Sequence, residues 1–297
     1  MADTFSSHPK ALEQRKLREI EHSRRRRSIV RGYERQTDTN SAEEADALDP
    51  VIRDPEAYQR HFSNMKFYSV ATSSKQYYEE WLRQRCWGAK VLDYCCGNGE
   101  AAIFAAKCGA DSIGIDISPE GIDNARANAA YEGVADKCKF EVMDAEALAF
   151  SDNTFDLVVE YGALHHLDFE TALRELRRVI KPNGQIICIE ALRHNPLFQL
   201  YRRFTPHLRT EWEVQHILTV HQIKCAARYF GSVDARFFHL AVLAAVPFRK
   251  TRIFGPLRRI LDAIDRVILR VPLVGRYAWI TVFTLSSAKK SENTVAS

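Results

Sequence analysis

The sequence predicts an α/β fold built on one mainly parallel sheet with helices on both faces. Between residues 89 and 192, short apolar segments of strand type alternate with helical segments. A turn with two glycines follows the first apolar segment, and acidic residues follow the next three. Strands that alternate with helices form doubly wound, Rossmann-like sheets. Two strand signals near the C-terminus extend the prediction to seven strands, of which the last runs antiparallel.

The expected elements follow one another at short intervals. Five strands are expected at residues 90–94, 112–117, 139–142, 155–160 and 185–190. Helices are expected between them, at residues 100–107, 119–131 and 168–180. A turn is expected at Lys181–Gly184, where Pro, Asn and Gly occur together, and a further helix at Thr219–Phe230. Two strong strand signals, Phe237–Val246 and Ala278–Leu285, complete the sheet.

Composition divides the chain into six segments. They are a charged helical N-terminal extension (1–50), an aromatic helical cover (51–88), the core (89–192), an insertion with a helix (193–238), the last strands with a basic amphipathic helical insertion at 247–277 (239–287), and a tail (288–297). The extension is expected to form a helix over residues 11–35, followed by a solvated linker at 37–47. Its arginine run at 24–27 suits either a phosphate-binding or nucleic-acid-binding patch or a solvated helix face.

Bulk composition narrows the class of protein. Its 297 residues allow one large α/β domain with extensions or two small domains, and 46% hydrophobic residues suit a globular core. The net charge of +4 is too small to argue for nucleic-acid binding. Seven scattered cysteines without a CxxC pair indicate free thiols and no metal site. A charged N-terminus, with no run of ~18 apolar residues, predicts a cytoplasmic protein that can still associate with a membrane surface.

The first strand ends in a tight turn with two glycines, and a helix follows. Gly97 and Gly99 let the backbone approach a ligand closely. The spacing is not GxGxxG, and the helix begins with an acid, Glu100. An acid at a helix N-terminus repels phosphate and suits a cationic ligand. Together with Asp93, this turn therefore favours the sulfonium and ammonium groups of S-adenosylmethionine over the pyrophosphate of a dinucleotide.

Acidic residues also follow the next three strands. Asp116 stands 17 residues after Gly99, the distance that one β-α-β unit needs, and its carboxylate can accept both hydroxyls of a ribose. Dinucleotide enzymes use the same device, so Asp116 alone does not discriminate between cofactors. Asp144 can accept from an adenine amino group, with the Ala145 backbone beside it. Glu160 closes the fourth strand, and all these strand ends are expected to converge on one crevice.

The order of these pieces resembles the class I S-adenosylmethionine-dependent methyltransferases, especially the ubiquinone and menaquinone C-methylase-like (methyltransferase type 11) branch. The motifs that carry the resemblance are LDYCCGNG, GIDIS, MDAEALAF, YGALHHL and KPNG, within residues 89–192. One departure is Cys95, where the family usually has a glycine. Because Gly97 and Gly99 remain, an altered turn geometry is expected rather than lost binding, and a non-catalytic relative is the alternative.

The resemblance implies roles for the residues at the matching positions. The implied cofactor-binding residues are Asp93, Gly97 and Gly99 at the methionine end, Asp116 at the ribose, Ile117, Asp144 and Ala145 at the adenine, and Glu160 in the same crevice. Tyr68, in the aromatic segment before the first strand, would either close over the methionine or pack in the core. The implied cofactor is S-adenosylmethionine.

Two adjacent histidines, His165 and His166, follow the fourth strand, where the methyl acceptor should lie. A histidine whose pKa is near neutral suits the base that a hydroxyl or an acidic carbon needs on methylation. The alternative is that one of them caps the next helix or packs against the sheet. Adjacent positions do not tell which of the two faces the site.

Two later segments are candidates for contacts with the acceptor and with a membrane. The insertion at 193–218 should cover the acceptor pocket. Its polar residues could contact the acceptor, or they could form salt bridges and helix caps instead; they are Tyr201, Arg202, Arg203, His207, Arg209, Glu211 and His216. Residues 247–277 hold eight basic and two acidic residues beside an apolar helical stripe. This pattern suits either peripheral contact with an anionic membrane or packing on protein.

These observations predict an enzyme that transfers a methyl group from S-adenosylmethionine to an oxygen or carbon atom of a small, lipophilic acceptor. Quinones, polyketides, prenyl compounds and lipid-linked compounds are the expected acceptor classes. An RNA or protein methyltransferase is the alternative, although no [ND]PP[YF] segment follows the fourth strand. A nicotinamide oxidoreductase and a binding protein without activity are the remaining hypotheses. The sequence does not predict the oligomeric state.

Overall fold

The computed structural model describes residues 14–24, 65–205 and 211–289, which belong to two compact units. The first unit contains residues 1–65 and 206–215, and the second contains the rest. In the first unit, residues 14–24 are helical, and the guanidinium carbon of Arg15 lies 4.5 Å from the centre of the Trp212 ring. The linker predicted at 37–47 and the arginine run beyond Arg24 lie outside the described residues.

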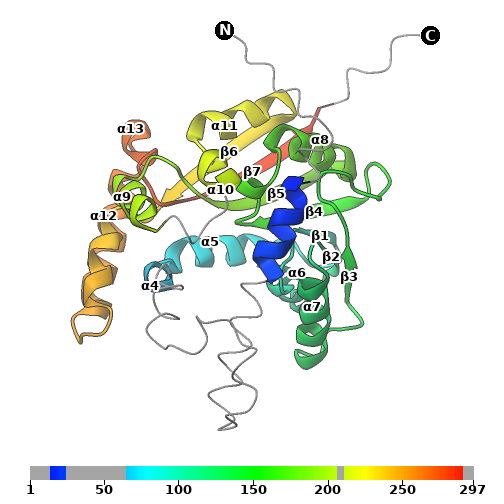
Figure 1. The fold of residues 1–297 in the computed structure, drawn as a ribbon, viewed down its shortest axis with the longest axis horizontal. Coiled ribbons are helices and arrows are strands. Elements are labelled where there is room, and N and C mark those ends of the chain that lie inside the picture. The colour runs from blue at the N-terminus through cyan, green and yellow to red at the C-terminus, as the bar shows by residue number, and fades with distance from the viewer. Residues whose placement is uncertain (1–13, 25–64, 206–210, 290–297) are drawn as a thin grey trace. The chain divides into compact units, whose positions relative to one another are not determined.

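The second unit is built on a seven-stranded sheet in the order β3-β2-β1-β4-β5-β7-β6 (Figure 1). Its strands are β1 (Lys90–Tyr94), β2 (Asp111–Asp116), β3 (Cys138–Val142), β4 (Phe155–Tyr161), β5 (Ile180–Ala191), β6 (Phe230–Phe238) and β7 (Ile280–Ala288). The first five strands are parallel, and β7 is antiparallel to β5 and β6. The predicted doubly wound sheet with an antiparallel last strand is therefore confirmed. The order reverses between β1 and β4, where sheets of this kind bind ligands at the C-terminal strand ends.

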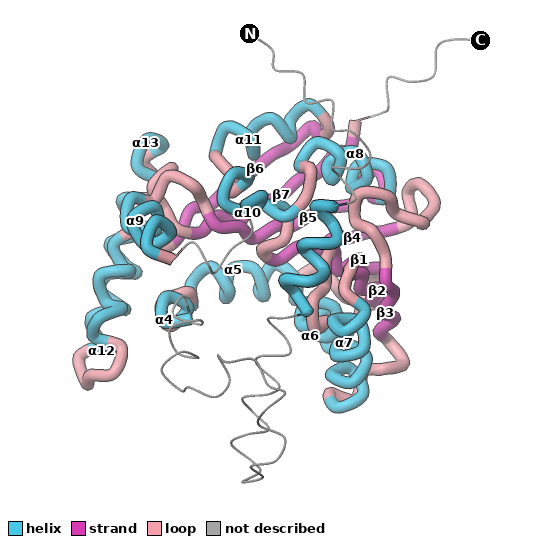
Figure 2. Tube along the Cα trace, in the orientation of Figure 1, coloured by secondary structure: helices cyan, strands magenta, loops and turns pink. Residues whose placement is uncertain are grey.

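Helices cover both faces of this sheet (Figure 2). One face carries α5 (Thr72–Arg83), α6 (Glu100–Lys107) and α7 (Pro119–Tyr131), and the other carries α8 (Phe169–Val179) and α11 (Val220–Cys225). The remaining helices are α4 (Met65–Tyr68), α9 (Pro196–Phe204), α10 (Glu211–His216), α12 (Phe254–Ile268) and α13 (Pro272–Gly275), with short 3-10 helices η2 (Leu164–His166), η4 (Ala226–Arg228) and η5 (Ala241–Phe248).

The sheet separates two apolar cores. Leu92 of β1 and Ile186 of β5 are fully buried in the core that contains α8. Their chain neighbours Val91 and Ile187 are fully buried in the core that contains α5. Successive side chains of a strand point to opposite faces, so a strand covered on both faces must be apolar throughout. This explains why the central strands are continuous apolar runs in the sequence.

Polar side chains mark where the helices begin. Ser118 before α7, Asp168 before α8, Asn195 before α9 and Thr219 before α11 each accept a backbone N–H from the first turn of the helix. Such caps satisfy donors that have no partner inside the helix. The bounds predicted at residues 90–94, 100–107 and 119–131 match those of β1, α6 and α7 because these local signals are strong.

Two predictions near the C-terminus are wrong. A strand was predicted at Phe237–Val246, but β6 begins at Phe230 and ends at Phe238. The apolar residues after it form the 3-10 helix η5. The helix predicted at Thr219–Phe230 is only α11 followed by η4. An apolar run of this length does not distinguish a strand from a buried helical turn.

A distant carboxylate determines the conformation of that run. The two oxygens of Asp265, in α12, accept hydrogen bonds from the backbone N–H groups of Leu240, Ala241 and Val242 at 2.7 to 3.1 Å. They satisfy the donors at the start of η5, which a strand would have directed to a neighbouring strand. The turn predicted at Lys181–Gly184 also differs, since these residues lie inside β5. No helix in the described part of the chain is long and apolar enough to cross a membrane.

Candidate active site

The turn between β1 and α6 has a left-handed backbone conformation at three alternate residues. Gly97 and Gly99 have φ angles of 55° and 81°, and Cys95 has a φ of 63°. A Cβ atom on Gly99 would also lie 2.8 Å from the Phe140 ring, so this position requires glycine for space as well as for conformation. Cys95 takes a backbone conformation that favours glycine, which explains why a glycine usually stands at this point of the motif.

Asp93 lies under this turn and is 2% exposed. Its Oδ2 atom accepts the N–H of Ala102 at 2.8 Å, in the first turn of α6. Burial raises the pKa of Asp93 to about 7, against the lowering effect of this hydrogen bond, and the nearby Asp116 and Glu100 carboxylates add to the rise. Asp93 therefore secures the start of α6 and contributes an ionisable group beneath the turn.

Asp116, at the end of β2, connects the turn to the next strand. Its Oδ2 atom accepts the N–H of Gly97, and its Oδ1 atom accepts the N–H of Ser118, both at 2.9 Å. The carboxylate is half-buried, as is the neighbouring Ile117. The structure thus brings together the turn and the acid that the sequence placed one β-α-β unit apart. The two backbone N–H groups fix the orientation of the carboxylate.

The loop after β3 contains Asp144 and Ala145. The Oδ1 atom of Asp144 accepts the N–H of Glu146 at 2.9 Å, and Asp144 is half-buried while Ala145 is buried. The hydroxyl of Tyr94, at the end of β1, donates to the carbonyl oxygen of Ala145 at 2.6 Å. Tyr94 therefore fixes this loop against the first strand. Sequence reasoning did not find this contact, since Tyr94 reads only as an apolar strand residue.

Glu160, at the end of β4, is fully buried. Its Oε1 atom accepts the N–H groups of Ala163 and Leu164, so the carboxyl group shapes the turn that carries the histidines. Among the described residues, its Oε2 atom has no hydrogen-bond partner. Burial and the neighbouring carboxylate of Glu190 raise the pKa of Glu160 well above its usual range. Glu160 therefore favours its protonated form more strongly than an exposed glutamate does.

Glu190, at the end of β5, is the partner of the first histidine. It is 1% exposed, and its Oε2 atom lies 2.8 Å from Nδ1 of His165. Its Oε1 atom accepts the N–H of Leu164 at 2.6 Å. Although burial opposes it, the charge of His165 and its hydrogen bond lower the pKa of Glu190. The pKa values of these two adjacent buried carboxyl groups are thus shifted in opposite directions, upward for Glu160 and downward for Glu190.

This pairing distinguishes the two histidines. An ionised carboxylate can only accept, so the hydrogen bond to Glu190 assigns a proton to Nδ1 of His165. In the neutral ring, the basic lone pair is then on Nε2. The ring of His166 lies 4.3 Å from that of His165, centre to centre. Glu190 itself was missed by sequence reasoning, and its one signal is an acid in an otherwise apolar strand.

Aromatic residues from α4 and α5 line the same strand ends. Tyr78 is 3% exposed, its ring lies 5.6 Å from that of Tyr161, and its hydroxyl has no hydrogen-bond partner among the described residues. Burial, with the neighbouring Asp93 and Glu160, raises the pKa of Tyr78 well above its usual range. The predicted Tyr68 is half exposed, and its ring lies 5.4 Å from that of Trp279.

The insertion after β5 contributes a cover helix, α9. The ring of Tyr201 lies 5.0 Å from that of Phe67, and Arg202 is half-buried, whereas Arg203 is exposed. His216 is half-buried at the end of α10. His207 and Arg209 lie outside the described residues, as does the side chain of Glu211.

Comparison with known proteins agrees with this geometry. Residues 91–184 match the model of a family described as a methyltransferase domain. The chain is 38% identical over 106 residues to the demethylmenaquinone methyltransferase of Lactiplantibacillus plantarum, a match that covers 34% of this chain and 45% of that protein. It is 36% identical over 107 residues to the same-named enzyme of Bacillus subtilis, covering 35% and 46% of the two chains.

An uncharacterized protein of Mycobacterium tuberculosis is 37% identical over 100 residues, covering 33% of this chain and 36% of that protein. The matched part thus spans less than half the length of each of these relatives. The likeness falls on the core that holds β1 to β4 and the start of β5. The chain therefore contains a class I S-adenosylmethionine-dependent methyltransferase domain, which confirms the family and the cofactor class expected from its motifs.

Proposed function

We propose that this protein methylates an oxygen or carbon atom of a small, lipophilic acceptor, with His165 as the general base. The observation that carries the proposal is the contact of 2.8 Å between Nδ1 of His165 and the buried Glu190, at the strand ends where the glycine-containing turn lies. A base is needed when the acceptor is a hydroxyl or an acidic carbon. The pairing supports His165 over His166 for this role.

S-adenosylmethionine, when bound, supplies a methyl group on a positively charged sulfur. The residues around the turn fit such a ligand, because two half-buried carboxylates lie at neighbouring strand ends, Asp116 at the end of β2 and Asp144 in the loop after β3. We assign Asp93, Gly97 and Gly99 to the methionine end and Tyr68 to its cover.

The remaining cofactor contacts follow the strand order. We assign Asp116 to the ribose hydroxyls, and Ile117, Asp144 and Ala145 to the adenine. The bond from Tyr94 to Ala145 keeps the adenine loop at a fixed distance from β1. Since Asp116 also accepts two backbone N–H groups, its orientation is set before the ligand arrives.

In the proposed reaction, Nε2 of His165 removes the acceptor proton while the acceptor atom forms its bond to the methyl carbon. Bound S-adenosylmethionine would supply the methyl group, and the electron pair of its carbon–sulfur bond would stay on the departing sulfur. Glu190 keeps the proton on Nδ1 and stabilises the imidazolium that forms. Glu160, whose raised pKa favours the protonated form, holds the turn that carries His165.

The lipophilic acceptor is supported by the aromatic cover and by relatives that are named demethylmenaquinone methyltransferase. Phe67, Tyr68, Phe198, Tyr201 and Trp279 form one aromatic cluster at this side of the sheet. Such a wall suits a flat or prenylated compound better than a polar one.

The test is transfer of a labelled methyl group from S-adenosylmethionine to lipid, RNA and protein fractions of cell extract. We expect label in the lipid fraction, and we expect His165→Asn to abolish it while S-adenosylhomocysteine still binds. His166→Asn is the matched control and should retain most of the activity. Label that enters only RNA or only protein would overturn the proposal, as would full activity of the His165 variant.

A further inference from the structure

Helix α12 presents its apolar stripe to both the protein and the solvent. Leu257 and Leu261 pack against the core, together with the two acids, Asp262 and Asp265, which are 6% and 5% exposed. On the other side, the side chains of Ile260, Ile264 and Val267 are 60%, 43% and 67% exposed. These three residues have helical spacing and share a face, which Ile253 and Val271, also exposed, extend at both ends.

Arginines border this exposed face. Arg259, Arg266 and Arg270 also have helical spacing, so they form a second row beside the apolar one. All three are exposed. Residues 247–277 contain eight basic side chains, of which seven are exposed, and the eighth, Arg258, pairs with the buried Asp262 at 3.4 Å. Because both acids of the segment point inward, its outer surface is more basic than its sequence suggests.

Helix α9 adds a second face of the same kind. Leu197, Leu200 and Phe204 are 57%, 55% and 72% exposed, and Arg203 is exposed beside them. On its inner side, Phe198 stacks on Trp279 with the ring centres 4.7 Å apart. The helix that covers the aromatic cluster therefore carries an apolar outer face, which a protein in water alone would not need.

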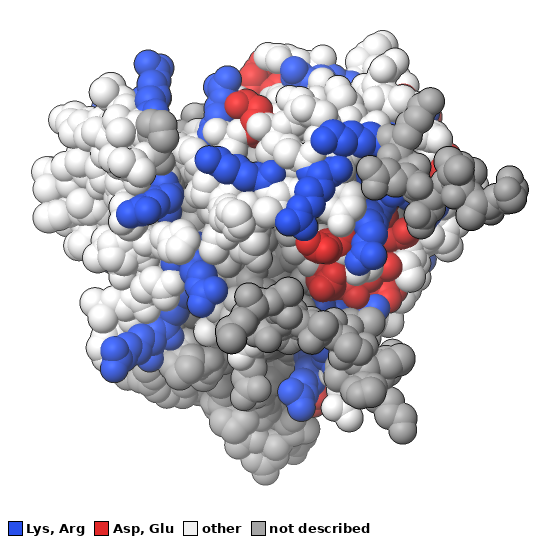
Figure 3. Space-filling view, turned by 90° about the horizontal axis from the view of Figure 1, so that it is seen from above, with Lys and Arg blue, Asp and Glu red and all other residues white. Residues whose placement is uncertain are grey.

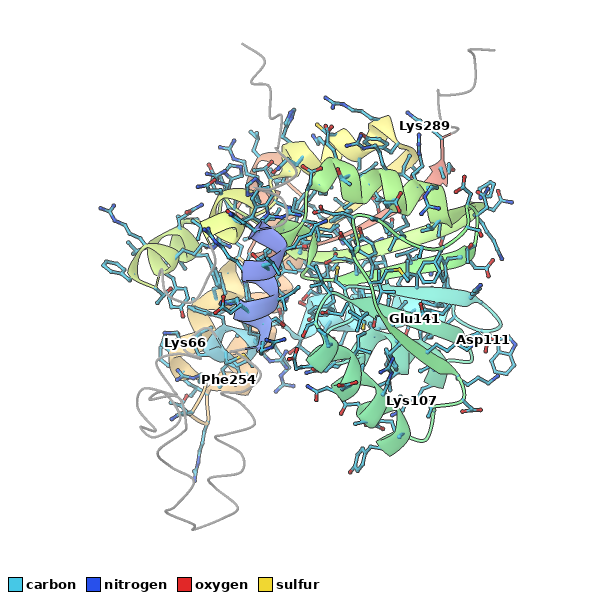
Figure 4. All side chains as sticks on the ribbon, turned by 45° about the vertical axis from the view of Figure 1, so that its right-hand side comes forward. Lys66, Lys107, Asp111, Glu141, Phe254 and Lys289 are labelled. Carbon is cyan, nitrogen blue, oxygen red and sulfur yellow. The ribbon has the colours of Figure 1, made fainter. Side chains whose placement is uncertain are left out.

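The two helices belong to one side of the second unit. Asn195, the cap of α9, donates through Nδ2 to the carbonyl oxygen of Tyr277, just after α13, at 2.8 Å. Phe198 and the inner residues of α12 share one apolar core. Figures 1 and 2 show α9, α12 and α13 together on the left. In Figure 4, Phe254 at the start of α12 lies far from Asp111 and Glu141, at the other end of the sheet.

We propose that the outer faces of α9 and α12, with residues 271–276, form one surface that binds an anionic lipid membrane. Exposed apolar residues bordered by arginines are the pattern of helices that lie in the membrane interface. Lys and Arg side chains keep their charged ends at the level of the headgroups while their stems cover apolar surface. In Figure 3, the left side, on which α9 and α13 lie in Figure 1, shows Lys and Arg among uncharged residues, while Asp and Glu gather elsewhere.

Charge favours a membrane over a second copy of the chain as the partner. Two copies joined symmetrically through this surface would bring the same arginines of both copies together. Like charges across an interface oppose association, whereas an anionic lipid surface attracts each arginine. The surface therefore complements a negatively charged lipid bilayer.

The surface also deepens the proposed function, on which this part rests. The inner face of α9 packs in the aromatic cluster that contains Tyr68, and its outer face belongs to the proposed membrane surface. A lipophilic acceptor dissolved in the bilayer would then reach the site beside α9 without crossing water. The acceptor class is accordingly a membrane-dissolved compound rather than a water-soluble one.

The first experiment is sedimentation of the full-length protein with phosphatidylcholine vesicles, with and without phosphatidylglycerol. We expect binding to the anionic vesicles only, and weaker binding at high salt. Replacing Arg259, Arg266 and Arg270 together by Gln should weaken binding by on the order of 10- to 100-fold. Ile260→Ser combined with Val267→Ser should weaken it as well, because the apolar contact is lost.

Matched controls come from elements of the second unit other than α9, α12 and α13. Arg126, Arg174 and Lys139 are exposed, so their combined replacement by Gln removes the same charge, and Tyr131→Ser removes a 90% exposed aromatic ring. These controls should bind as the parent protein does. Absence of binding to anionic vesicles, or equal loss in the controls, would overturn the proposal. So would a dimer in light scattering that the α12 variants convert to a monomer.

A second experiment separates this inference from the proposed function. Methyl transfer is measured with the lipid-fraction acceptor in detergent micelles and in anionic vesicles. We expect the arginine variant to be active in detergent and slow with vesicles. Equal rates of the variant and the parent with vesicles would overturn the membrane route alone. No transfer by the parent protein in either medium would instead contradict the proposed function.

Discussion

The carboxylate of Glu190 lies 2.8 Å from Nδ1 of His165, while the equally buried Glu160 beside it directs its bonds to backbone N–H groups. Two acids at the ends of neighbouring strands thus serve different purposes. The pKa of Glu190, which contacts His165, is lowered, whereas the pKa of Glu160, which holds the turn, is raised. The difference leads to a paired prediction about their amide variants.

Glu190→Gln should lower kcat by about 10²-fold or more, because an amide does not stabilise the imidazolium. It should also move the pKa seen in the pH profile of kcat downward, since a negative charge beside the base is lost. Glu160→Gln should leave kcat within about fivefold, because the amide resembles the neutral acid. Single-turnover rates across pH test both variants. Similar losses in the two would contradict the assignment.

Asp116→Ala should weaken binding of S-adenosylhomocysteine by about 1–3 kcal/mol, because ribose hydroxyls would lose their acceptor. The variant also loses the two hydrogen bonds that hold Gly97 and Ser118, so some loss of stability is expected. Calorimetric titration measures the first effect and urea unfolding the second. Asp111→Ala, on the same strand but 78% exposed, is the control. Unchanged affinity of the Asp116 variant would refute its role.

The raised pKa of Asp93 predicts a pH dependence of folding. Because its pKa of about 7 in the folded protein lies above the unfolded value near 3.9, the folded state binds the extra proton between these limits. The free energy of unfolding should therefore fall as the pH rises from about 4 to about 7, by up to about 4 kcal/mol. Asp93→Asn, which keeps an oxygen for Ala102, should flatten this slope. Urea titrations at pH 5 to 8 give the answer, and identical slopes in both proteins would contradict it.

The left-handed backbone conformation of Cys95 predicts that glycine and alanine substitutions there differ in stability in the opposite order to the usual one. Glycine should be more stable than alanine at this position by about 1 kcal/mol, because only glycine takes a positive φ without steric conflict. At Cys96, which is buried and does not have a positive φ, alanine should be the more stable of the two. Thermal unfolding of the four variants tests this. The same order at both positions would show that the turn is not strained.

Removal of Asp265 should destabilise the protein by about 2 kcal/mol or more, since three backbone N–H groups at the start of η5 would lose their acceptor. Asp265→Asn keeps one accepting oxygen and should lose less than Asp265→Ala. Arg270→Ala, nearby but exposed, should change little. The free energies of unfolding from urea titrations rank the three. A neutral Asp265→Ala would show that the bonds contribute nothing to stability.

The elements around the turn after β1 could be predicted from the sequence because their signals are local. Ser118 with Pro119 marks the start of α7, and Gly97 with Gly99 marks the turn after β1. Glu190 and Tyr94 were not found, because their partners lie 25 and 51 residues away and the chain pattern around them is simply apolar. Likewise η5 depends on Asp265, which no local pattern connects to it. The contact of His165, rather than His166, with Glu190 also depends on residues that are far apart in sequence.

The bond between Asn195 and the carbonyl of Tyr277 joins parts of the chain that are 82 residues apart. It lies where the chain enters its final strand, so the helix after β5 is anchored by residues that are synthesised much later. During synthesis, that helix lacks this bond until the residues before β7 have been made. A change near Tyr277 would therefore affect a helix that lies far from it in sequence.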